Sequence, residues 1–174
     1  YLDKFGNVLI NNRIGLVYGY KNIPKDFRVW NYNSGFAWAA KREFFENFGL
    51  FHRGILGSGD GFMVNTFTKN ATFDLYVERF KWNEHIVKDY LNWSIPVINY
   101  IGDDIGYIDA EIYHNWHGDL VNRMYLQRAE ILKDFNPFTM LKEDQNGLWN
   151  WNDIVDQDFK NKIINYFRQR KEDG

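Results

Sequence analysis

GILGSGDGFMVNTF, residues 54–67, places four glycines around a single aspartate and then runs into an apolar segment. Glycine loses more backbone freedom on folding than any other residue, so this spacing indicates positive φ angles or a close backbone approach near Asp60. Asp60 also stands where a helix N-cap is expected, ahead of Phe62, Met63 and Phe67. We therefore expect a tight loop that leads into a helix at Asp60.

The other elements follow from apolar periodicity and from the positions of glycine and proline. Residues 1–20 are expected to form extended pieces, and residues 34–40 and 105–116 are expected to be strand-like. Helices are expected over 41–49, ended by Gly49, over 83–93, over 119–135 with Asp119 as its cap, and over 158–170. Residues 136–153 are expected to be irregular. The sequence thus predicts a mixed α and β fold of the α/β class in one domain, 1–174.

Composition limits the classes of function. The net charge of −2 gives no electrostatic support for binding nucleic acid, and no apolar run is long enough for a membrane span. The first residues lack the pattern of a signal peptide, and the chain has no cysteine, which excludes disulfides and cysteine-based zinc sites. These features favour a cytoplasmic location. Phosphate-binding loops of the GxxxxGK[ST] type and GxSxG elbows are also missing.

Several residues could carry chemistry. A carboxylate at Asp60 is either a plain helix cap or a base that takes a proton from a hydroxyl in the space cleared by the glycines. His114 and His117, in YHNWHG, are candidate ligands for Mn²⁺ or Zn²⁺, or else histidines with local hydrogen bonds. Because side chains alternate along a strand, only one of the two is expected to reach a given site. Arg123 suits a phosphate held at a helix start, or a surface salt bridge.

Aromatic residues make up 19% of the chain, and many stand beside Asn, Gly or His, as Trp116 does. Aromatic faces next to hydrogen-bonding groups suit sugar rings, although the same residues also fill protein cores.

Three segments taken in order resemble a known family: NSGFAWAAKREFFENFGLF, GILGSGDGFM and YIDAEIYHNWHGDLVNRMYLQR. Together they resemble the C-terminal half of a GT-A glycosyltransferase of the β-1,4-galactosyltransferase and polypeptide GalNAc-transferase type, including related bacterial and viral enzymes. The resemblance covers roughly residues 30–130. It implies a GT-A fold and metal-assisted transfer of a sugar, such as a hexose, from a nucleotide-sugar donor to a glycan or another hydroxyl acceptor.

The resemblance also implies roles for individual residues. Asp60 matches the base of inverting members, and His117, or alternatively His114, matches the ligand of Mn²⁺ or another divalent cation beside the donor diphosphate. The residues implied to contact the donor or acceptor are Asn33, Ser34, Gly35, Trp38, Gly57, Ser58, Gly59, Trp116 and Arg123.

The chain departs from the family pattern because no DxD motif precedes residue 30, where only Asp3 and Asp26 are acidic. Two explanations stay open: the chain is the acceptor-side and metal-side portion of a longer enzyme, or a degenerate relative that serves as an interaction domain. A non-catalytic carbohydrate-binding module is a further alternative, based on the aromatic clusters.

Overall fold

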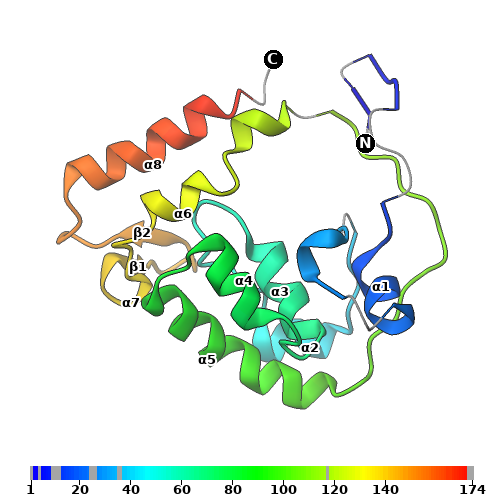
Figure 1. The fold of residues 1–174 in the computed structure, drawn as a ribbon. Coiled ribbons are helices and arrows are strands. Elements are labelled where there is room, and N and C mark those ends of the chain that lie inside the picture. Colours follow the sequence, from blue (N-terminus) through cyan, green and yellow to red (C-terminus); the bar gives the residue numbers. More distant parts are fainter. Residues whose placement is uncertain are drawn as a thin grey trace. The chain divides into compact units, whose positions relative to one another are not determined.

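The computed structural model describes residues 2–3, 5–8, 13–23, 27–34, 37–116 and 118–171. The chain divides into two compact units. Figure 1 shows the helices and strands that they contain. The first unit comprises Tyr1–Tyr76 and Asn92–His117, and the second comprises Val77–Leu91 and Gly118–Gly174. The division falls inside two helices, α4 (Phe73–Phe80) and α5 (Glu84–Ile101).

Helices dominate the first unit. It contains α1 (Leu16–Asn22), the short 3-10 helix η1 (Val29–Asn31), α2 (Arg42–Phe48) and α3 (Gly59–Phe67), besides parts of α4 and α5. The prediction of extended structure over 1–20 is wrong for residues 16–20, which belong to α1. Among the described residues of that stretch, extended pairing is limited to isolated bridges, antiparallel for Leu2 with Val8 and parallel for Gly15 with Asn33.

The core of the first unit forms around α3. Residues 62–66 of this helix are all buried, and the Phe62 ring packs edge-on against Phe51 and Tyr76, with centroids 5.1 and 5.6 Å apart. The polar side chains of this helix bond back to their own backbone: Asn65 Nδ2 donates to the Gly61 carbonyl, 2.8 Å away. A helix buried on almost every side explains why its sequence shows no strong amphipathic period.

The second unit combines helices with one hairpin. Its elements are η2 (Leu120–Arg123), α6 (Gln127–Ile131), α7 (Pro137–Met140), β1 (Leu141–Glu143), β2 (Trp149–Trp151) and α8 (Gln157–Gln169). Strands β1 and β2 pair antiparallel, with Leu141 opposite Trp151 and Glu143 opposite Trp149. Helix and strand therefore both occur, which confirms the mixed α and β class, and the sheet has two strands within the described ranges.

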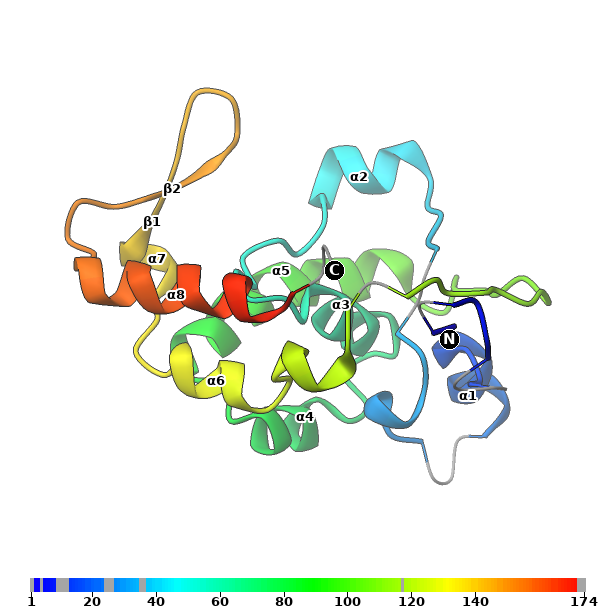
Figure 2. The same ribbon diagram turned by 90° about the horizontal axis from the view of Figure 1, so that it is seen from above.

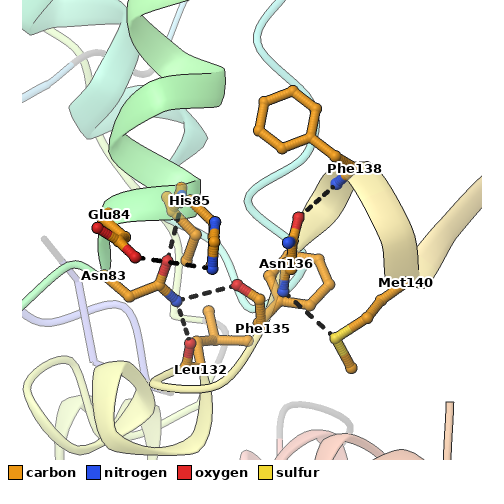
Figure 3. A network of polar contacts seen from close by, with 9 residues as sticks. Asn83, Glu84, His85, Leu132, Phe135, Asn136, Phe138 and Met140 are labelled. Atoms are coloured by element: carbon orange, nitrogen blue, oxygen red, sulfur yellow. Dashed lines mark hydrogen bonds and ion pairs between the residues drawn. The ribbon is translucent and has the colours of Figure 1, made fainter.

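Asn83 joins the start of α5 to the segment between α6 and α7 (Figure 3). Its Nδ2 donates to the carbonyls of Leu132, at 2.5 Å, and Phe135, at 3.0 Å. Its Oδ1 accepts the N–H of Ile86 in the first turn of α5, at 3.0 Å. One side chain thus caps a helix and satisfies two carbonyls about fifty residues further along the chain.

Three helices besides α3 were predicted correctly. The 41–49 prediction corresponds to α2, which ends at Gly49 with a φ of 59°, and the 158–170 prediction corresponds to α8, capped by Asp156. The 83–93 prediction falls within α5, which continues through Pro96 to Ile101.

Four further predictions were wrong. Residues 37–40 and 105–116 contain no assigned strand, and residues 136–153, expected to be irregular, contain α7 and the hairpin. The helix expected over 119–135 is broken into η2 and α6, because Met124 adopts a left-handed φ of 45°. Asp119 occupies the N-cap position of η2, yet its side chain makes no capping hydrogen bond.

No helix in the described part of the chain is both long enough and apolar enough to cross a membrane.

Candidate functional site

The glycine-rich loop ends with two residues of positive φ, Gly57 at 97° and Ser58 at 67°. Helix α3 then begins at Gly59, so Ser58 is its N-cap and Asp60 lies one residue further into the first turn. The expectation that Asp60 is the cap is therefore wrong by two positions. Its carboxylate remains exposed in the first turn of the helix.

Close packing accounts for two of the glycines. A Cβ on Gly54 would lie 2.7 Å from the Gly57 carbonyl oxygen, and a Cβ on Gly61 would lie 2.3 Å from the hydroxyl of Tyr76. These distances are too short for any side chain, and Gly57 supplies a positive φ. The sequence-based expectation of positive φ and close approach near Asp60 is confirmed.

Ser34 meets Asp60 at the start of α3. The Ser34 hydroxyl donates a hydrogen bond to Oδ2 of Asp60, which is 26 residues further along the chain. The preceding residue, Asn33, is fixed by its backbone: its N–H donates to the Ile14 carbonyl and its carbonyl accepts from Leu16, both at 3.0 Å. The structure thus brings together two of the three segments that carry the family resemblance.

Trp38 lies near the opposite end of α3. Its ring packs edge-on against Phe67, the last residue of the helix, with centroids 5.2 Å apart, and 37% of its surface is exposed. At 1.5 Å rise per residue, roughly 10 Å of helix separates Phe67 from Asp60. The structure does not bring Trp38 to the Asp60 carboxylate.

The third segment of the family resemblance, residues 107–128, is divided between the two units. His114 and Trp116 belong to the first unit and are half-buried, and the His114 carbonyl accepts the N–H of Leu2 at 2.9 Å. His117 lies outside the described residues, as does Gly35. Because residues 105–116 form no assigned strand, strand alternation no longer decides between the two histidines.

Arg123 belongs to the second unit, where it ends η2. Its guanidinium donates to the hydroxyl of Tyr125 at 3.1 Å, and its carbonyl accepts from the hydroxyl of Tyr166 at 3.2 Å. The expected contact between Arg123 and a phosphate remains a prediction.

Metal-binding side chains do not cluster in the described part of the chain: no group of three or more His, Asp or Glu residues there could hold an ion. Those residues therefore do not by themselves form a complete metal site. An open surface hollow does occur beside α2, lined by Ala40, Arg42, Phe45 and Glu46, none of which was predicted as a site residue.

The carboxylates with clearly lowered pKa values are those of Asp3, Asp103 and Asp144. The Lys69 ammonium hydrogen-bonds to Asp103 and lowers the pKa of that carboxyl, and Asn7 does the same for Asp3. The backbone N–H groups of Leu148 and Asn146 lower the pKa of Asp144. Asp103 is exposed, and Asp3 and Asp144 are half-buried. These shifts reflect local turns and ion pairs.

Sequence reasoning missed Phe51 and Tyr76, which support the loop below Asp60. Tyr76 lies on α4, a helix that was not predicted. The signal was present, because Phe73, Tyr76, Val77 and Phe80 recur at the spacing of one helix face.

No protein-family model, curated protein or solved structure matches this chain.

Proposed function

We propose that the chain is the acceptor-side and metal-side portion of a GT-A glycosyltransferase, with Asp60 as the base that activates an acceptor hydroxyl. The observation that supports this proposal best is the contact of Ser34 with Asp60. It joins NSG and GSGD, two segments of the family resemblance, at an exposed carboxylate in the first turn of a helix.

The chemistry assigned to these residues is simple. The Ser34 hydroxyl occupies one carboxylate oxygen, Oδ2, and so fixes the orientation of the group. Oδ1 is then left to accept the proton of a sugar hydroxyl as that hydroxyl attacks the anomeric carbon of the donor. The carbon–oxygen bond to the nucleotide diphosphate breaks in the same step, and the diphosphate leaves as the anion.

The proposal includes Mn²⁺ or another divalent cation, with His117 or His114 as its ligand. Such a cation neutralises the diphosphate as it leaves. Since the described residues do not complete a ligand set, the acid–base step above is assigned to Ser34 and Asp60 alone.

Donor binding is tested by thermal melting of the chain with UDP-, GDP- and dTDP-sugars, each with and without Mn²⁺. Binding to the native state at a hundredfold excess over the dissociation constant adds about 2.7 kcal/mol of stability. For a chain of this size that corresponds to an increase in Tm of roughly 5–10 °C. We expect such an increase with one nucleotide family, in the presence of metal. A constant Tm with every donor would contradict donor binding by this chain.

The matched control is Asp60→Asn. This variant keeps the shape of the side chain and the hydrogen bond from Ser34, so its Tm should respond to the donor as the wild type does. A glycan that raises the Tm without any nucleotide would instead favour the carbohydrate-binding module.

A further inference from the structure

Residues 104–116 of the first unit run as a long open segment between α5 and η2 (Figures 1 and 2). Both ends of its central part are fixed. The ring of Tyr107 packs edge-on against Tyr18 of α1, with centroids 5.2 Å apart, and the His114 carbonyl accepts the Leu2 N–H. Between these points every residue is exposed, and Ile108 reaches 87%. Ile112 is 55% exposed as well, so this anchored segment presents more than one exposed apolar side chain.

The backbone of residues 106–113 is not paired by any described part of the chain. Residues 106–113 make no backbone hydrogen bond to any other residue within the described ranges. A row of free N–H and C=O groups is the template that an exposed sheet edge offers to another strand. Only a second backbone satisfies both kinds of group at the spacing of a β ladder.

The sequence of the segment alternates with the period of a strand. In an extended conformation Ile108, Ala110 and Ile112 fall on one face. Asp109 and Glu111 fall on the other face, with a tyrosine on each side of them. This is the pattern of a strand with one apolar face and one acidic face.

Within the described ranges, the acidic face has no cationic partner. At the start of the segment, Asp103 pairs with Lys69 and the Asp104 carboxylate lies 3.8 Å from the Lys41 ammonium. These two carboxylates therefore have cationic partners. Asp109 forms no ion pair within the described part of the chain. Glu111 accepts a hydrogen bond from the hydroxyl of Tyr113 at 3.3 Å, and residues 103–113 contain no Lys or Arg.

We propose that residues 106–113 bind an extended segment of another polypeptide by strand addition. The partner strand alternates apolar and basic residues, and its basic side chains lie opposite Asp109 and Glu111. Backbone pairing provides the affinity, and charge provides the selectivity.

A second copy of this chain fits less well. Antiparallel pairing centred on Ala110 keeps the apolar residues on one face, but it places Asp109 of each copy opposite Glu111 of the other. Like charges directly opposite each other destabilise a strand pair.

The test uses two capped peptides, one of alternating Val and Lys and one of alternating Val and Glu. Hydrogen–deuterium exchange of residues 106–113 is measured in the 174-residue chain with each peptide. The basic peptide is expected to slow exchange there, and the acidic peptide is expected to leave it unchanged. The double variant Asp109→Lys with Glu111→Lys is expected to bind the basic peptide at least about tenfold more weakly and to gain protection from the acidic one.

Ala110→Pro provides the backbone control, because proline removes one N–H donor from an exposed position. It should abolish the protection while the Tm of the chain stays the same. Equal protection by both peptides, or protection by neither, would overturn the proposal. Protection without any peptide, together with a dimer in light scattering, would assign the segment to a second copy and overturn it as well. This inference does not depend on the proposed transferase activity.

Discussion

The hydroxyl of Ser34 donates a hydrogen bond to Oδ2 of Asp60, across 26 residues of sequence. Each residue reaches this position for a different reason. Ser34 follows Asn33, whose backbone N–H and carbonyl both form hydrogen bonds with residues beside the start of α1. Asp60 lies in the first turn of α3, which begins after two loop residues of positive φ. The contact therefore depends on the loop and on the bridge beside α1 together.

Asp60→Asn should lower the rate of sugar transfer by about 10²–10⁴-fold, because the amide cannot accept the proton of the hydroxyl. Ser34→Ala should lower it less, by roughly ten- to a hundredfold, since it removes one hydrogen bond to a charged group. The measurement is kcat with a saturating donor. Equal losses in the two variants would contradict the separate roles of base and orienting residue.

Gly61→Ala should destabilise the protein by about 1–3 kcal/mol, because the new Cβ would lie 2.3 Å from the hydroxyl of buried Tyr76. Urea denaturation measures the change. Gly106→Ala is the matched control: a Cβ at that position meets nothing within 4 Å, so stability should stay the same or rise slightly.

Combining Gly61→Ala with Tyr76→Phe tests the cause of that loss. Removal of the hydroxyl relieves the shortest contact, so the double variant should lose less stability than the sum of the two single variants. Simple additivity would show that the Tyr76 hydroxyl is not what excludes a side chain at Gly61.

Lys81→Gly should stabilise the protein by about 1 kcal/mol. Lys81 follows α4 with a φ of 52°, and the bonds from Trp82 N–H to Val77 and from Lys81 N–H to Glu78 form a Schellman cap. Glycine adopts this left-handed conformation without the steric cost that lysine meets. Lys81→Ala is the control and should leave stability nearly unchanged in urea denaturation. A loss of stability with glycine would contradict the assignment of the cap.

Asp144 should titrate below its ordinary pKa of 3.8, because the backbone N–H groups of Leu148 and Asn146 donate to Oδ1 and Asn150 donates to Oδ2. A depressed folded-state pKa means that the stabilisation is present above 3.8 and is lost as the pH falls through the folded-state value. The protection of the Leu148 amide, measured by NMR as its exchange rate relative to the intrinsic rate at the same pH, should fall in that acidic range. In Asp144→Asn this pH dependence should disappear, and its persistence would assign it to another group.

Asn83→Ala should destabilise the second unit by about 2–4 kcal/mol, because it removes two donors from half-buried contacts and one helix cap. Asn83→Asp keeps the acceptor for Ile86 and loses both donors, so it separates the two effects. If the effect of Asn83→Ala comes only from the lost helix cap, Asn83→Asp should be close to the wild type in urea denaturation.

The local sequence predicted a helix correctly where the apolar periodicity agreed with the residues that cap or end the helix. In α8 the buried residues Phe159 and Ile163 recur four apart behind the Asp156 cap, and Gly49 ends α2. Helix α1 was not foreseen because LVYGYKN contains a glycine and has no acidic first turn or capping side chain.

The local sequence does not predict that the helix expected over 119–135 breaks at Met124. The Arg123 carbonyl accepts a hydrogen bond from Tyr166 of α8, 43 residues away, so a tertiary contact supports the end of η2 where the sequence continues with a helical period. Residues 105–116 show the opposite case. Their alternation predicts a strand, but a strand needs a partner, and residues 106–113 make no backbone pair with any residue in the described part of the chain.

At Asp60 the sequence predicted the tight loop and the helix, and it placed the cap two residues too late. Caps are decided by backbone dihedrals, and here Ser58 adopts a left-handed φ that is unusual for a residue other than glycine. The contact with Ser34 has no local signal, since it depends on how two distant segments pack.

The most direct test of the proposed function is release of nucleotide from a panel of sugar nucleotides, measured with Mn²⁺ and a mixture of glycan acceptors, for the wild type and Asp60→Asn side by side. Our account predicts acceptor-dependent release with one donor, reduced at least about a hundredfold in Asp60→Asn. Equal release by the two proteins would contradict this prediction. A lack of release from every sugar nucleotide in both proteins would contradict it as well.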